Sequence, residues 1–347
     1  MMSETFNLIP AVQKADIYRQ ISNRTGIPIF AVEKDWWVVQ TLSVIFGMEV
    51  GQHLVFKGGT SLSKAWKLIE RFSEDIDLAI DRDFFGYDGE LSKKERGKLR
   101  KASGIYVDTV FFNELKSAFE ANGFTDLRME LVQEVESDKD RTIHIFYPNV
   151  IPSPGYVQPK IQLEIGCRSL REPFTMQSIA SLVDESYPDS EFARKAVNVP
   201  TVNPERTFLE KIFLLHEEFQ RPAEKMRVDR LSRHLYDVFK LSGKDFAVKA
   251  LSNRELYRTI VDHRYKFNRI GHINYNLHQP QTIDMLPPTL VMDAWKADYA
   301  TMVEQMIYET NPPTFNELIS ELTRLKEKIN SMEWKFEIEF PNPVISD

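Results

Sequence analysis

The stretch of sequence from Phe56 to Ala79 is FKGGTSLSKAWKLIERFSEDIDLA. The run HLVFK at residues 53–57 predicts a short buried strand, and the Gly-Gly pair after it predicts a turn. Residues 60–70 then have the pattern of a helix. In DIDLAI, at residues 75–80, polar and apolar residues alternate, which predicts a second strand. The stretch therefore predicts a strand, a glycine turn, a helix and another strand in succession.

The glycine pair, Gly58 and Gly59, is a candidate phosphate-binding turn. Glycine lacks Cβ and lets a phosphate approach the backbone closely. The start of the following helix supplies N–H donors and a favourable dipole. Thr60 or Ser61 is the expected N-cap, and both hydroxyls are candidate donors to the same phosphate. The turn is not a P-loop, because no Gly-Lys-Ser/Thr closes it.

The two aspartates of DIDLAI, Asp75 and Asp77, are the candidate metal ligands. Residues i and i+2 of a strand point to the same face, so the two carboxylates are expected to converge. Like charges at close range repel and require a cation. Mg²⁺ takes hard oxygen ligands and shares them with substrate phosphates. A phosphate cradle beside a carboxylate pair is what metal-assisted nucleotidyl transfer requires.

Each half of this pattern has a simpler interpretation on its own. A Gly-Gly pair before a helix is usually only a turn, and an Asp-x-Asp is usually an exposed strand end. The ordered combination of strand, glycine turn, helix and Asp-x-Asp strand favours the catalytic interpretation. The sequence contains no Gly-x-Ser-x-Gly elbow, so it gives no support for a hydrolase with a catalytic triad.

The composition is that of a folded protein. The chain has 347 residues, 44 Lys and Arg against 51 Asp and Glu, and a net charge of −7. The single cysteine, Cys167, excludes an intrachain disulfide and a cysteine-based zinc site, and favours a reducing cytoplasm. The N-terminus does not resemble a signal peptide, and the longest apolar stretch, residues 36–48, is too short to span a bilayer. We therefore expect a cytoplasmic protein with no membrane partner.

The pattern along the chain changes from mixed to helical. The predicted fold class is α/β (α+β): an N-terminal domain with a small mixed sheet, followed by a mostly α-helical C-terminal domain. The expected division is an α/β domain at 1–170, a linker region at 171–203 and a helical domain at 204–347. Residues 86–104 are polar and predict a loop or insertion. Further strands are predicted at 126–135, 141–147 and 159–166, and helices at 10–25, 31–47, 108–122, 204–220, 229–242, 290–309 and 314–332.

The chain resembles the nucleotidyltransferase AbiEii/AbiGii toxin family, which belongs to the DNA polymerase β-like nucleotidyltransferase superfamily. That superfamily has a Gly-Gly/Ser motif followed by Asp-x-Asp. The matching residues are Gly58, Gly59, Thr60 and Ser61 in the first motif, and Arg71, Ser73, Asp75 and Asp77 in the second. Similarity continues in EKDWWVVQTL (33–42), PERTFLEKIFLLHEE (204–218), SRHLYDV (232–238) and DYATMVEQMI (298–307).

The resemblance implies the activity, the cofactor and the partners. The expected enzyme is an Mg²⁺-dependent (or Mn²⁺-dependent) nucleotidyltransferase that moves NMP from an NTP to an RNA acceptor such as tRNA. The expected role is the toxin of a type IV toxin–antitoxin (abortive infection) system, with phage defence. A cognate antitoxin is expected to be encoded nearby, with no direct contact implied.

The resemblance also implies three further site residues. A third carboxylate is expected on a neighbouring strand, and Glu164 is the candidate because KIQLEIG places it on one face with Gln162; the alternative is a solvated sheet face. Lys211 is expected to contact nucleotide phosphate; the alternative is a lysine that covers the core edge. Asp237 is expected to be an active-site acid, whereas periodicity alone favours a surface ion pair with Arg233.

The predicted site is therefore the following. The catalytic set is Asp75, Asp77, Glu164, Lys211 and Asp237, with Asp75 and Asp77 as metal ligands. The nucleotide-binding set is Lys57, Gly58, Gly59, Thr60, Ser61, Arg71 and Lys211.

Two basic clusters are candidates for nucleic-acid contact. Lys93 to Lys101 has six basic residues and one acidic residue, a local charge of +5. The other cluster contains Arg221, Lys225, Arg227, Arg230 and Arg233. An acidic protein that modifies RNA needs such local patches to hold phosphates. The alternative is that both are ordinary solvated surface.

Two other functions use the same residues. An NTP-dependent kinase-like phosphotransferase acting on protein also positions metal and phosphate, so sequence does not separate it from a nucleotidyltransferase. A non-catalytic nucleotide-binding interaction module would keep the fold, but the presence of both Asp75 and Asp77 argues against it.

Overall fold

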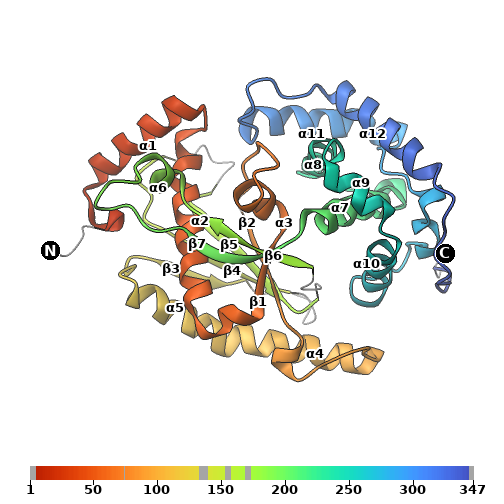
Figure 1. Ribbon diagram of the computed structural model, residues 1–347, viewed down its shortest axis with the longest axis horizontal. Coiled ribbons are helices and arrows are strands. Elements are labelled where there is room, and N and C mark those ends of the chain that lie inside the picture. The colour runs from red at the N-terminus through yellow and green to blue at the C-terminus, as the bar shows by residue number, and fades with distance from the viewer. Residues whose placement is uncertain (1–4, 74, 133–139, 153–157, 169–172, 344–347) are drawn as a thin grey trace. The chain divides into compact units, whose positions relative to one another are not determined.

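The computed structural model describes residues 5–73, 75–132, 140–152, 158–168 and 173–343 (Figure 1). The chain forms two compact units. The first unit is Met1–Lys67 with Phe72–Val202, and the second unit is Leu68–Arg71 with Asn203–Asp347. The short segment 68–71 thus belongs to the second unit although the first unit precedes and follows it in sequence.

The first unit is built on a seven-stranded mixed sheet with the order β3-β4-β5-β2-β1-β7-β6. β2 is antiparallel to β1 and parallel to β5, and β1 is parallel to β7. The predicted class, a mixed sheet followed by a helical region, is confirmed. The strands are β1 (Leu54–Lys57), β2 (Asp75–Ile80), β3 (Arg128–Leu131), β4 (Arg141–Phe146), β5 (Lys160–Gly166), β6 (Phe174–Ile179) and β7 (Val197–Val202).

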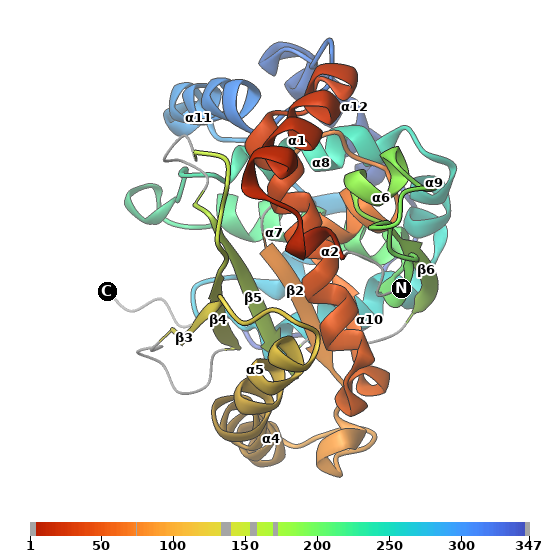
Figure 2. The same ribbon diagram turned by 90° about the vertical axis from the view of Figure 1, so that its left-hand side faces the viewer.

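One face of this sheet is covered by α2 (Ile29–Gly47), which crosses it in both ribbon views (Figures 1 and 2). α2 is apolar nearly all round, which is the pattern of a buried helix. Trp36 and Trp37 are buried and pack against Phe124, and Trp37 stacks on Tyr147. The other helices of the unit are α1 (Ala11–Thr25), α3 (Gly58–Thr60), α4 (Lys93–Tyr106), α5 (Phe112–Ala121) and α6 (Leu182–Ser186).

Three parts of the first unit differ from the sequence expectation. The expected loop at 86–104 contains α4, because Ser92 and Glu95 form a capping box and Leu99 supplies a buried anchor. The expected linker at 171–203 carries β6 and β7, which pair with each other and extend the sheet through β1. The expected helix at 60–70 is short: α3 continues as a π-helical turn, Ser61–Ala65, and then ends.

The expected strand at 126–135 is observed as β3, and its positions 133–135 lie outside the described residues, as do 171 and 172 of the expected linker.

The second unit is helical and centres on α7 (Pro204–Phe219). Its apolar side chains Phe208, Ile212 and Leu215 follow helical spacing and are fully or almost fully buried. The remaining helices are α8 (Ser232–Ser242), α9 (Asp245–Ser252), α10 (Arg254–Phe267), α11 (Met292–Gln305) and α12 (Phe315–Asn330). Within the described part of the chain, no helix combines the length and hydrophobicity that a bilayer crossing needs.

Candidate active site

Asp75 and Asp77 lie on one face of β2. The burial of the strand alternates, with Ile76 and Leu78 buried and the two aspartates partly exposed. In the register with β5, Asp75 is opposite Gln162 and Asp77 is opposite Glu164. Residues opposite each other on adjacent strands share a face. The structure therefore brings both aspartates and Glu164 to the same polar face of the sheet.

The charges on this face raise the proton affinity of Glu164. Burial, and then the neighbouring carboxylates of Asp77 and Asp75, raise the pKa of Glu164 to about 7, while Lys57 opposes the rise. Gln162 donates a hydrogen bond to Glu164, with 3.0 Å between Nε2 and Oε1. A face with three closely spaced acids carries excess negative charge, and this is the electrostatic setting in which a divalent cation binds.

The glycine turn lies directly against Asp77. Gly58 has φ of +80°, a left-handed conformation that favours glycine. A Cβ built on Gly58 would lie 1.8 Å from Asp77 Oδ2. Lys57, the last residue of β1, is opposite Asp77 in the strand register. Only a residue without a side chain allows this approach, so the glycine is required by the position of the aspartate.

The hydroxyls after the glycine turn are engaged within the chain. Thr60 Oγ1 donates to the backbone carbonyl of Asp75 at 2.5 Å, and Ser61 Oγ donates to that of Gly58 at 2.9 Å. Both residues are buried, and neither caps the helix, which begins at Gly58. The expectation that Thr60 or Ser61 is the N-cap is wrong. The hydroxyls instead connect the turn to β2 and to itself.

Substituting Gly58 tests whether its contact with Asp77 matters for chemistry. Gly58→Ala is expected to lower transfer activity about 100-fold, the size expected when a reacting group is displaced by about 1 Å. The added methyl group forces the Asp77 carboxylate to rotate away. Steady-state kinetics of NMP transfer measure the effect.

Gly123 provides the matched control. It has φ of +82°, and a Cβ there would meet no atom within 4 Å. Both alanine variants should lose about 1–2 kcal/mol of stability from the left-handed strain. Only the Gly58 variant should lose activity, and an equal loss in both variants would contradict the proposed role of the Gly58–Asp77 contact.

The segment EKD at residues 33–35 supports the turn from α2. Asp35 Oδ1 pairs with Lys64 Nζ at 2.6 Å, and Asp35 Oδ2 accepts a hydrogen bond from the backbone N–H of Leu182. Lys64 belongs to the π-helical turn that follows Gly58. Glu33 accepts hydrogen bonds from the backbone N–H groups of Val150 and Ile151. Asp35 therefore anchors the segment after the glycine turn, and Glu33 anchors residues 150 and 151.

Asp140 is a further candidate site residue that the sequence analysis did not name. It sits beside Gly166 at the end of β5, where a Cβ on the glycine would lie 1.9 Å from Asp140 Oδ1. Burial raises the pKa of Asp140, and the charge of Asp77 adds to this, while Lys57, Arg168 and Arg100 oppose it. No sequence motif marks a single Asp that precedes a strand. The position of Asp140 beside Gly166 becomes visible only when β4 pairs with β5.

The donor set of this face fits a magnesium ion. Among the described residues, no three His, Cys, Asp or Glu side chains form a ready-made metal cage. Mg²⁺ does not need one, because it is usually held by one or two carboxylates together with substrate phosphates and water. Asp75 and Asp77 offer two hard oxygen donors on one face, and Gly58 and Gly59 of the adjacent turn are partly exposed.

The second unit contains a separate charged cluster around Asp237. Arg71 donates two hydrogen bonds to the Asp237 carboxylate, at 2.6 and 2.7 Å, and Lys211 Nζ lies 2.7 Å from Asp237 Oδ2. The side chains of Arg71, Lys211 and Asp237 are 2%, 8% and 0% exposed. The alternative drawn from periodicity, a surface ion pair of Asp237, is wrong, because the side chain of Asp237 is fully buried.

The charges of this cluster are strongly coupled. Burial works against the ionised form of Asp237, but Arg71 and Lys211 outweigh it and hold the pKa of Asp237 below its ordinary range. Burial lowers the pKa of Lys211, and Asp237 partly reverses that effect. His234 Nδ1 is 3.4 Å from Lys211 Nζ, and burial lowers the pKa of His234. The cluster therefore consists of a carboxylate with two cations and a neutral imidazole.

The chain matches one family of known proteins. A family model described as "Nucleotidyl transferase AbiEii toxin, Type IV TA system" matches residues 46–321. No curated protein sequence matches the chain. Among solved structures, the chain is similar to MenT4, a nucleotidyltransferase toxin from Mycobacterium tuberculosis, at 16% identity and a TM-score of 0.42, over 92% of this chain and 98% of MenT4. Because the family model spans well over half of its length, the chain belongs to the AbiEii family of nucleotidyltransferase toxins of type IV toxin–antitoxin systems.

Proposed function

We propose that this nucleotidyltransferase transfers NMP from an NTP to an RNA acceptor such as tRNA, and that the reaction depends on Mg²⁺ or Mn²⁺. The observation that carries the proposal is the close approach of Gly58 to the carboxylate of Asp77, on the same sheet face as Asp75 and Glu164. A triphosphate held at the turn would lie next to two carboxylates that need a cation.

The residues of the first unit have distinct proposed roles. Asp75 and Asp77 hold the divalent ion, which neutralises the triphosphate and the leaving pyrophosphate when it is bound. The Gly58-Gly59 turn, with Lys57 before it, positions the phosphates. Glu164, which lies opposite Asp77 on the same face, is the proposed general base that accepts the proton of the attacking hydroxyl.

The residues of the second unit keep their proposed roles with one refinement. Arg71 and Lys211 are the proposed phosphate-binding cations, as the family resemblance implies. Asp237 bonds to both side chains and is buried, which favours a role in holding these cations over direct acid catalysis.

The proposed biological role follows from the family. The RNA acceptor is inactivated by the added nucleotide, and the cell tolerates the toxin only when the antitoxin encoded nearby is present. Phage defence and a cytoplasmic location are parts of the same proposal.

The test compares the position of a radioactive phosphorus label. Purified protein, Mg²⁺, total RNA and each NTP in turn are incubated with label at the α or the γ phosphate. We expect label on RNA from the α position only, no transfer after chelation with EDTA, and recovery with Mg²⁺ or Mn²⁺. Label on protein from the γ position would show the kinase-like activity and overturn the proposal.

A further inference from the structure

We propose that the exposed face of α4 is the surface that binds the phosphate backbone of the RNA acceptor. This inference rests on the proposed function, because it names where the acceptor of that site is held. The helix was expected to be a loop, and its basic residues are therefore placed on one rigid element only by the structure.

The four lysines of α4 face solvent. Lys93, Lys94, Lys98 and Lys101 are all exposed, and none of them forms an ion pair with a described residue. The helix is anchored through Leu99, Ser103 and Gly104, which are buried. Glu95 is the only acid between Lys93 and Lys101, and its carboxylate accepts the N-cap hydrogen bond from Ser92. The helix thus presents four lysines that pair with no described acid, although Glu95 is near enough to Lys98 to interact with its charge.

The second basic cluster is different. Arg221 and Arg227 both pair with Glu218, which is 1% exposed. Arg227 also donates its backbone N–H to Glu218 at 2.7 Å. Because a single carboxylate pairs with both guanidinium groups, their positive charge is partly compensated locally. Among the described residues, α4 has four exposed lysines outside ion pairs and the second cluster has one, Lys225, so α4 offers the larger basic surface to a polyanion.

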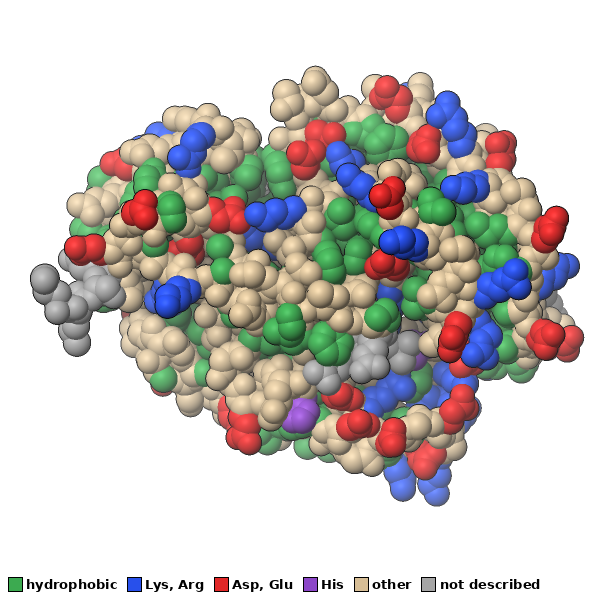
Figure 3. All heavy atoms as spheres, viewed as in Figure 1, with side chains coloured by type: hydrophobic (Ala, Val, Ile, Leu, Met, Phe, Trp, Pro, Cys, Tyr) green, Lys and Arg blue, Asp and Glu red, His purple; other side chains and the backbone are tan. Residues whose placement is uncertain are grey.

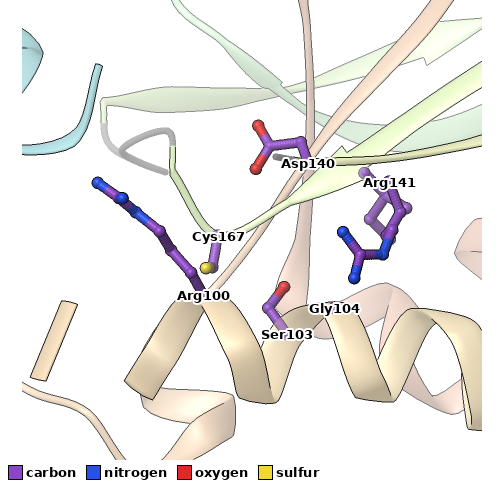
Figure 4. Close-up of a pocket in the computed structure, with 7 residues that line it drawn as sticks. Arg100, Ser103, Gly104, Asp140, Arg141 and Cys167 are labelled. Carbon is purple, nitrogen blue, oxygen red and sulfur yellow. The ribbon is translucent and has the colours of Figure 1, made fainter. Parts of the chain in front are cut away.

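The side of α4 opposite its exposed lysines packs toward β5. Arg100 of α4 and Asp140 line one small pocket with Ser103, Arg141 and Cys167, and its volume of about 10 Å³ has room for about one water molecule (Figure 4). Asp140 is close enough to Arg100, Lys57 and Asp77 for all three charges to act on it. The inward side of α4 is therefore near Asp77, and α4 belongs to the same unit as the proposed site.

The chemistry of α4 fits nucleic acid better than other ligands. A local charge of +5 within a chain of net charge −7 concentrates attraction for a polyanion at one place. Figure 3 shows Lys and Arg side chains at its lower edge, in the region of α4, with Asp and Glu side chains beside them. Lysines contact phosphates without reading bases, so this surface would position RNA and leave sequence choice to other residues.

The experiment measures RNA binding directly in the absence of NTP. Fluorescence anisotropy of a labelled, mixed-sequence single-stranded RNA is followed with the full chain at several salt concentrations. The test variant is Lys93→Gln/Lys94→Gln/Lys98→Gln/Lys101→Gln. Loss of four phosphate contacts should weaken binding about 10-fold or more at low salt and reduce the slope of log Kd against log salt by about 3.

The matched control removes four exposed lysines from the second unit. It is Lys244→Gln/Lys249→Gln/Lys296→Gln/Lys328→Gln, which changes the net charge equally. It should bind RNA as the wild type does. Melting curves check folding, and Lys98→Glu/Lys101→Glu replaces the test variant if that variant is unfolded. The inference is wrong if the wild type, the α4 variant and the control variant all have the same RNA affinity and the same salt slope. It is also wrong if the α4 variant and the control variant lose RNA affinity equally.

This result is independent of the proposed reaction. If only the α4 variant binds RNA more weakly, the proposed RNA-binding surface is supported even when no nucleotide is transferred. In that case only the proposed reaction is wrong. If the wild type transfers nucleotide to RNA but the α4 variant binds RNA as tightly as the wild type, the proposed reaction stands and the proposed RNA-binding surface is wrong.

Discussion

Asp77→Asn is expected to lower NMP transfer by about 1,000-fold or more, the range found when a catalytic group is removed, and to leave the folded protein at least as stable as the wild type. The two effects have one cause. Asp77 lies opposite Glu164, two residues from Asp75 and opposite Lys57 of β1, so two acids repel its charge and one lysine attracts it, which leaves net repulsion until a cation binds. Neutralising it removes both this repulsion and a metal ligand.

The measurement combines kinetics with thermal melting. In the absence of ligand the variant should melt at or above the temperature of the wild type. Mg²⁺ with a non-reactive NTP analogue should raise the melting temperature of the wild type only, because ligand binding stabilises the folded state. The control is Asp83→Asn, an exposed carboxylate shortly after β2 that should change neither quantity. A marked loss of stability in the apo Asp77 variant would show that the carboxylate is structural.

The second large effect concerns stability and is expected at Asp237. Asp237→Asn should lower the free energy of unfolding by about 3–5 kcal/mol, the range for breaking a buried ion pair from one side. Arg71 and Lys211 would remain buried beside a neutral amide. Denaturant unfolding measures the change, and the exposed Asp229→Asn should stay within about 0.5 kcal/mol of the wild type.

A triple substitution separates the ion pairs from the packing. Arg71→Met/Lys211→Met/Asp237→Leu removes all three charges together and should recover most of the lost stability, since apolar replacement of a buried ionic cluster is often neutral. If the triple variant were as unstable as Asp237→Asn, loss of packing would explain both results and the ionic explanation would be wrong.

The ionic explanation also fixes the pH dependence. The folded-state pKa of Asp237 lies below its unfolded value of 3.8, so the folded carboxyl binds its proton more weakly than the unfolded one. Protonation therefore favours unfolding. The contribution of the cluster is complete above about pH 4 and is lost as the pH falls through the folded-state pKa. The stability of the wild type relative to the triple variant should decrease in that acid range.

Several features of the fold could be predicted from local patterns. The unit around residues 54–80 was predictable because strand alternation and a Gly-Gly turn depend on neighbours in sequence. The face shared by Gln162 and Glu164 followed from the same alternation. α4 was not predicted, because a helix with one buried leucine has almost no apolar stripe and resembles a polar loop.

The sequence by itself determined that two aspartates share one face of a strand, that a glycine turn precedes them, and that sheet gives way to helices after residue 203. Only the tertiary structure decided that Gly58 touches Asp77, that Glu164 lies opposite Asp77, and that Asp237 is buried between Arg71 and Lys211. The physical reason is the range of the interactions. Periodicity and turns are set by residues a few positions apart, whereas the register between strands and the partners of a buried charge are chosen by residues far apart in sequence, once the chain is packed.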